Sequence, residues 1–100
     1  GLNMFITNNL NGREGGFQMV FKNGWTVSVE WHEDAFSDEE NRTAQIGAWD
    51  KDLNWFVFDE GKIDADTIKG YVAPEQVASF IKMISMLEGE LGGLNDGLGI

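Results

Sequence analysis

The chain has no cysteine, one proline, one histidine and only seven basic residues among its 100. Without cysteine, disulfides and thiolate metal sites are excluded, and the redox state of the compartment is left open. No apolar run approaches the ~20 residues of a membrane span, and no basic-then-apolar leader indicates export. We therefore expect a cytoplasmic protein that does not bind membranes.

Seventeen acidic residues outnumber the seven basic ones and give a net charge of −10. A surface of this sign repels nucleic-acid phosphate, so we do not expect binding to DNA or RNA. Carboxylates can also imitate a phosphate backbone, but a mimic needs its charges in a row. Here the charges are scattered through several loops, and solubility is the simpler explanation of the acidic composition.

Length and composition indicate a single domain over residues 1–100. Apolar residues make up 42% of the chain and aromatic residues 12%, which is typical of a folded core rather than of disorder. We expect an irregular N-terminal segment over residues 1–16, within which Met4–Thr7 is a candidate short strand. Glycines in the last residues predict a loosely ordered tail over residues 90–100.

The longest alternation of apolar and polar residues runs from Phe17 to Trp31 and predicts two strands of a hairpin. Asn-Gly between the strands is a strong hairpin signal. A two-residue loop would set the apolar row of one strand against the polar row of the other. A three-residue loop, Lys22–Gly24, places all apolar side chains on one face, with Gly24 at positive φ. This register pairs Phe21 with Trp25, Met19 with Val27 and Phe17 with Val29.

Three more strands and one helix are predicted after the hairpin. The strands span Thr43–Trp49, Trp55–Phe58 and Thr67–Val72; the second has no alternation and should be covered on both faces. Pro74 opens the helix, as proline at the first helical position often does, and Gly89 should end it. One helical stripe is apolar and should pack on the sheet. Its members are Val77, Phe80, Ile81, Ile84 and Leu87.

These elements predict an α+β fold, in which a bent antiparallel sheet of about five strands carries one C-terminal helix. A small SH3- or Sm-like β-barrel is the alternative, because five short strands joined by tight turns can also close on themselves.

Two polar stretches are candidate sites of chemistry. His32, with Glu30 and Asp34 on its side of the chain, is a candidate general base or metal ligand, but a solvated histidine at a strand end is the simpler expectation. Asp50-x-Asp52-x-Asn54 begins like a calcium loop. The pattern then fails, with Trp55 in place of the glycine and Gly61 in place of the bidentate glutamate. We expect a turn there, and we assign no catalytic, metal or cofactor-binding residue.

Three pieces of the chain, NGWTVSVEW, TAQIGAWDKDLNWFVF and IKGYVAPEQVASFIKMI, resemble a group of small proteins of tailed bacteriophages. A hairpin, a turn and a helix entry recur there in this order. The resemblance covers roughly Asn23–Ile84 and departs at Ala73, where similar chains often carry a Ser or Thr helix cap. It implies a viral accessory protein in a bacterial cytoplasm, and it brings no functional residues.

The leading functional hypothesis is a non-enzymatic interaction module that binds itself or a host or viral protein. One amphipathic helix covers one sheet face only, so large side chains elsewhere need another cover, and we expect an oligomer. The candidate interaction surface consists of Trp49, Trp55, Val57 and Met86. The alternatives are a small-molecule or nucleotide-binding module that uses a Trp-rich sheet face, and a metal-dependent enzyme centred on His32.

Overall fold

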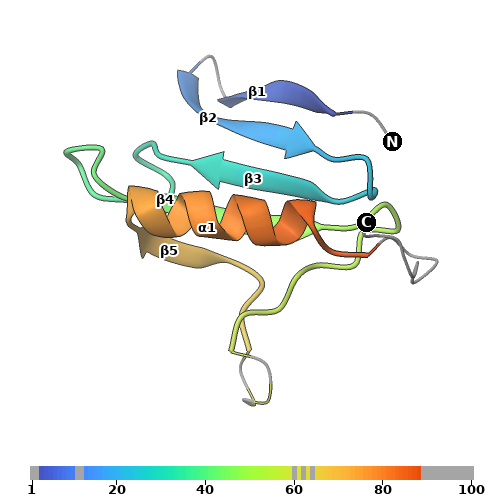
Figure 1. Cartoon of the computed structure of the whole chain (residues 1–100). Coiled ribbons are helices and arrows are strands. Elements are labelled where there is room, and N and C mark those ends of the chain that lie inside the picture. Colours follow the sequence, from blue (N-terminus) through green and yellow to red (C-terminus); the bar gives the residue numbers. More distant parts are fainter. Residues whose placement is uncertain (1–2, 11–12, 60, 62, 64, 89–100) are drawn as a thin grey trace.

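The computed structural model describes residues 3–10, 13–59, 61, 63 and 65–88 of the chain. Five antiparallel strands form one sheet in the order β1-β2-β3-β4-β5, so every strand lies beside its neighbour in sequence. Helix α1 runs across one face of the sheet, over the middle strands (Figure 1). The strands are β1 (Met4–Leu10), β2 (Arg13–Val20), β3 (Thr26–Glu30), β4 (Ala44–Trp49) and β5 (Lys69–Val72), and α1 spans Pro74–Ser85.

The α+β prediction is therefore confirmed, and the barrel alternative is wrong. The sheet is open, with β1 at one edge and β5 at the other. Among the described residues, no helix is long and apolar enough to cross a membrane.

The predicted hairpin register is confirmed. Phe17 pairs with Val29 and Met19 with Val27. The amide of Phe21 donates to the carbonyl of Trp25 at 2.8 Å, and Gly24 has a φ of +93°. The next strand continues the pattern, since Val27 pairs with Ala48 and Val29 with Ile46.

The core is the layer between α1 and this apolar face. Its buried side chains come from the sheet and from the predicted helical stripe: Val27, Val29, Ala44, Ile46, Ala48, Val72, Phe80 and Ile84. Phe80 contacts two rings from the connection between β4 and β5, with centroid distances of 5.5 Å to Phe56 and 5.3 Å to Phe58. The helix thus packs on strands below and on an aromatic pair at its side.

Asn23 joins the hairpin turn to the far end of the helix. Its side-chain amide donates to the carbonyls of Ile84 and Leu87, each at 2.8 Å, and its Oδ1 accepts the amide of Trp25 at 3.0 Å. The last carbonyls of a helix have no partner within the helix. The hairpin turn therefore supplies the C-terminal cap that the helix sequence lacks.

Two predicted elements are wrong. The expectation of an irregular segment over residues 1–16 fails because β1 and β2 occupy most of it, with Met4 paired to Val20 and Thr7 to Phe17. Pairing along a complete neighbouring strand overrides the turn-forming tendency of the Asn and Gly residues. Trp55–Phe58 is not a strand and makes only isolated bridges, from Trp55 to Trp49 and from Phe58 to Asp66.

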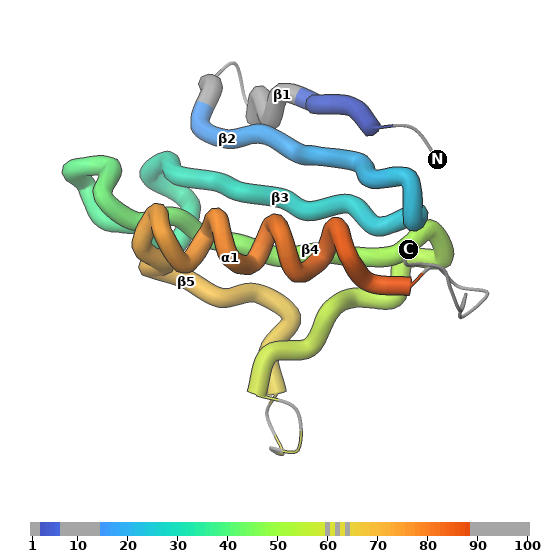
Figure 2. The backbone as a smooth tube through the Cα atoms, in the orientation of Figure 1, coloured from blue at the N-terminus to red at the C-terminus, as the bar shows by residue number. Residues whose placement is uncertain are grey.

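The connection between β4 and β5 leaves the sheet, as the tube in Figure 2 shows. Within it, Phe56 and Phe58 turn to Phe80, while Trp55 packs on Trp49. The helix begins at Pro74 as predicted, with Ala73 at the N-cap and no side-chain cap. It ends earlier than expected, at Ser85; Gly89 and the predicted tail over residues 90–100 lie outside the described residues.

Replacing Phe80 with alanine should lower the free energy of unfolding by about 3–5 kcal/mol, because Phe80 is 7% exposed and touches two other rings. Urea denaturation followed by circular dichroism measures this change. Met83→Ala, on the same helix at 41% exposure, is the matched control and should cost far less. Equal losses in the two variants would contradict this account of the core.

Asn23→Ala should cost about 1–3 kcal/mol, because the carbonyls of Ile84 and Leu87 and the amide of Trp25 each lose a hydrogen bond. Asn23→Asp should cost more, since it removes both donated bonds and adds negative charge at the negative end of the helix dipole. Thermal denaturation compares both with Lys22→Ala, an exposed neighbour in the same turn. An unchanged midpoint in Asn23→Asp would rule out the cap.

Candidate functional site

The sheet face opposite α1 brings together two of the four residues of the candidate interaction surface. Trp49 and Trp55 lie with their ring centroids 4.8 Å apart and their planes tilted by 44°. Trp55 is 42% exposed. Val57 lies between the two phenylalanines that pack on Phe80, and it is 37% exposed.

Met86 does not belong to this group. It caps the C-terminal end of α1, on the other side of the sheet, and is 71% exposed. Sequence reasoning correctly placed Met86 outside the buried stripe, but the four side chains do not form one surface. The reason is that α1 and the tryptophan pair lie on opposite faces of the same sheet.

Beside the tryptophans the face is polar. Gln18, Ser28 and Gly47 lie side by side on β2, β3 and β4, and Glu30 pairs with Gln45 one step further along. These residues, with Trp49, Trp55 and Ile68, line a hollow of about 160 Å³. Sequence alternation predicts that they share a face, but it does not predict a hollow there.

His32 is not the solvated histidine that we expected. Its side chain is 14% exposed, and Nε2 lies 3.0 Å from Oε1 of Glu30. Nδ1 accepts the backbone amide of Asp34 at 3.1 Å, so both ring nitrogens are engaged. No group of three or more His, Asp or Glu side chains that could hold a metal occurs among the residues described. The hypothesis of an enzyme centred on His32 stays a prediction.

The acidic stretch after Trp49 is a turn, as predicted. Oδ1 of Asp50 accepts the amides of Asp52 and Asn54, both at 2.9 Å, and Leu53 takes a φ of +65°. The amide of Asn54 is the main cause of a lowered pKa at Asp50, with help from its side chain and from Asp52. The carboxylate that began the calcium-like pattern is therefore used to close the turn.

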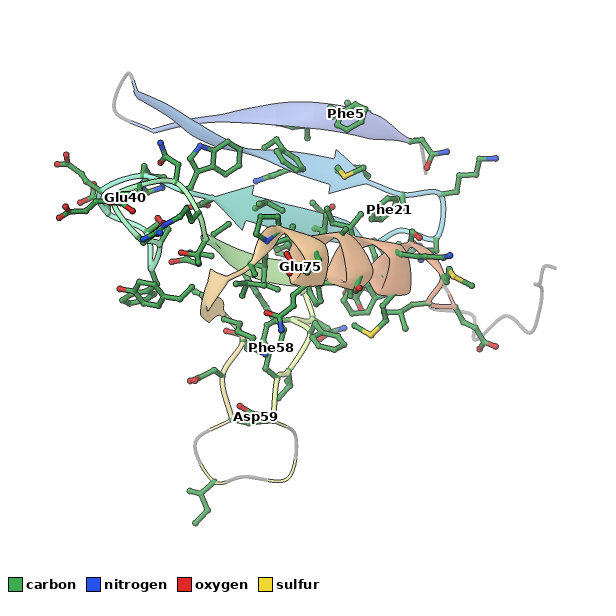
Figure 3. The ribbon with its side chains drawn as sticks, turned by 60° about the vertical axis from the view of Figure 1, so that its left-hand side comes forward. Phe5, Phe21, Glu40, Phe58, Asp59 and Glu75 are labelled. Carbon is green, nitrogen blue, oxygen red and sulfur yellow. The ribbon has the colours of Figure 1, made fainter. Side chains whose placement is uncertain are left out.

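Asp38 organises the other acidic loop, between β3 and β4. Its Oδ1 accepts the amides of Arg42 and Thr43 at 2.7 and 3.1 Å, and the Arg42 guanidinium lies 3.1 Å from Oδ2. Desolvation alone would raise the pKa of Asp38, but these hydrogen bonds from Arg42 and Thr43 lower it. Figure 3 shows Glu40 at the outer end of this loop; it is the second carboxylate that Arg42 contacts.

The two edges of the sheet differ in their protection. At β5 a bulge places Gly70 and Tyr71 opposite Gln45 alone, and Tyr71 has a φ of +55°. Tyr71 donates its amide to the carbonyl of Phe36 at 2.8 Å, so the loop before β4 covers this edge. Lys69 adds a charge. Bulges, lysines and covering loops are the common means of preventing edge-to-edge pairing.

Within the part of the chain that the structure describes, the regular part of strand β1 has no bulge, lysine or covering loop. Met4–Thr7 pairs with β2 without a break, and the one irregularity follows between Thr7 and Asn9. Residues 3–10 carry no charge. Met4, Phe5 and Ile6 are 47%, 75% and 39% exposed, and Figure 3 shows Phe5 on the outermost strand, apart from α1. Sequence reasoning missed this edge because it assigned most of the segment to a loop.

On the helix side, a cavity of about 340 Å³ lies between the first turns of α1 and strands β2 and β3. Its lining is mostly apolar and includes Phe17, Trp31, Val77 and Ile81. Arg42 also contributes to the lining, with its guanidinium held by Asp38 and Glu40. The sequence gives no signal for this cavity, which depends on how the helix sits on the sheet.

Comparison with known proteins finds no matching family model, no matching curated protein and no matching solved structure. The resemblance to small bacteriophage proteins stays a prediction.

The lowered pKa of Asp38 predicts a specific pH dependence. A carboxyl whose folded-state pKa lies below its ordinary 3.8 stabilises the fold above that pH, and the contribution is lost as the pH falls through the folded-state pKa. Asp38→Asn should therefore be less stable than the unmodified chain at about pH 7, with a gap that narrows toward about pH 2. Urea midpoints measure the gap. Glu39→Gln is the control, and a pH-independent gap for Asp38→Asn would contradict the assignment.

Proposed function

We propose that the protein is a non-enzymatic interaction module that self-associates by pairing strand β1 with β1 of a second copy. The observation that carries the proposal is the contrast between the two edges. Strand β5 is bulged, charged and covered, whereas Met4–Thr7 is regularly paired and uncharged, with Met4, Phe5 and Ile6 exposed. An exposed edge of this kind is a template for another strand.

A second copy is a suitable partner because an antiparallel strand can pair with itself around a two-fold axis. Each chain carries a net charge of −10, so most surfaces of two copies repel each other. β1 has no charge, and pairing there brings no carboxylate of the strand against its counterpart. Burying a large apolar side chain such as Phe5 is worth roughly 1.5–3 kcal/mol.

From the resemblance in the sequence, we propose that this module is a bacteriophage accessory protein acting in a bacterial cytoplasm, where a host or viral protein could be a further partner.

A second candidate function is small-molecule binding on the Trp-rich sheet face. It is favoured by the hollow of about 160 Å³ between the tryptophan pair and Glu30. The two functions use different parts of the molecule and do not exclude each other.

Sedimentation at tens of micromolar protein should give twice the 11.1 kDa mass of one chain. Phe5→Lys should reduce the mass to that of one chain, because it would place two like charges close together at the paired edges. Phe5 is 75% exposed, so the variant should fold normally.

Met86→Lys is the matched control, since it adds the same charge at an exposed methionine on the helix, and it should leave the dimer intact. A single-chain mass for the unmodified protein would refute self-association. Dissociation by Met86→Lys but not by Phe5→Lys would move the interface from β1 to the helix.

A further inference from the structure

The hollow on the sheet face opposite α1 has two unlike ends. Ser28 and Gly47, which pair across β3 and β4, both line it. Trp49 lies two residues from Gly47 along one strand, and Glu30 lies two residues from Ser28 in the other direction along the sheet. Two residues of a strand span roughly 6.7 Å. A compact group a few ångströms across can therefore lie between the tryptophans and the carboxylate.

Because residue 47 is a glycine, the indole of Trp55 can lie close to the strand at the side of this hollow. A Cβ at Gly47 would come within 3.2 Å of Cζ3 and 3.8 Å of Cε3 of Trp55. The indole of Trp55 therefore lies close to Gly47, beside the carbonyl of Thr67; it lines the hollow and remains 42% exposed.

Among the described residues that line the hollow, Glu30 is the charged one, and no lysine or arginine accompanies it there. Its side chain is 22% exposed; Oε1 lies 3.0 Å from Nε2 of His32, and Oε2 accepts the hydroxyl of Ser28 at 3.4 Å. The chain as a whole carries −10. Phosphate-bearing ligands such as nucleotides are therefore repelled, whereas cations are attracted.

We propose that this hollow binds a small organic cation of the methylated-ammonium class. Its positive group lies against the ring face of Trp55, with Glu30 at the other end of the hollow. A cation over an aromatic face is attracted by the negative charge of the π system, and tryptophan binds such groups best. This inference rests on the second candidate function and is independent of self-association through β1.

Choline is the probe, and 3,3-dimethylbutan-1-ol is its uncharged counterpart of nearly the same shape. In ¹H–¹⁵N spectra, choline should shift the indole signals of Trp55 and Trp49, while those of Trp25 and Trp31 remain in place and serve as internal controls. The neutral alcohol should bind about tenfold more weakly, because it lacks the charge that the ring and the carboxylate recognise. Methyl glucoside and AMP complete the comparison, and neither should bind as tightly as choline.

Two variants assign the binding to the named side chains. Trp55→Leu keeps an apolar group but removes the ring, and Glu30→Gln removes the charge; each should weaken choline binding about tenfold. Glu75→Gln removes one exposed carboxylate on the opposite face and should leave binding unchanged. If a variant does not fold, the titrations of the unmodified chain with choline and with the neutral alcohol still test the proposal.

Equal binding of choline and the neutral alcohol would overturn the proposal, and so would tighter binding of the glucoside or of AMP. Unmoved indole signals at millimolar choline would overturn it too. Phe5→Lys should bind choline like the unmodified chain, so failure of this site and failure of the β1 interface are separate results.

Discussion

The fold depends on one constraint, which is that the apolar row of the middle strands, Val27 and Val29 on β3 with Ile46 and Ala48 on β4, must face α1. Val27 and Val29 meet this requirement only if the hairpin has a three-residue loop, which pairs them with Met19 and Phe17. A slip by one residue would put Ser28 and Glu30 under the helix. The same turn carries Asn23, whose amide closes the far end of α1. Register of the sheet and position of the helix are therefore set together.

Because one helix covers one face, function is expected at the parts of the sheet that the helix leaves open. These are the edge at β1 and the face that carries Trp49 and Trp55. The other edge is closed by the bulge at Tyr71 and by the carbonyl of Phe36. Among the described residues, the regular part of β1 carries no charge and exposes Met4, Phe5 and Ile6, and this contrast with β5 favours addition of a further strand at β1.

The open face gains its shape from a residue without a side chain. Gly47 leaves room for Trp55, which lies beyond the end of β4 and returns to pack on Trp49. The space that remains ends at Glu30, and the result is a hollow with an aromatic wall and a negative end. Carboxylates elsewhere have structural roles, since Asp38 and Asp50 accept backbone amides that hold their loops. The acidic composition is thus partly a matter of loop construction.

The sequence by itself determined the features that depend on neighbours along the chain: the hairpin register from the period-two pattern, the helix start at Pro74 and its apolar stripe, and the turn closed by Asp50. Only tertiary structure decided the rest. Asn8, Asn9, Gly15 and Gly16 have the composition of a loop, yet pairing with a full neighbouring strand makes them part of β1 and β2. Trp55–Phe58 has the composition of a strand, but Phe80 draws Phe56 and Phe58 to one side while Trp49 and Gly47 receive Trp55 on the other. Such choices depend on which surfaces lie opposite each other in space, and local sequence carries no information about distant surfaces.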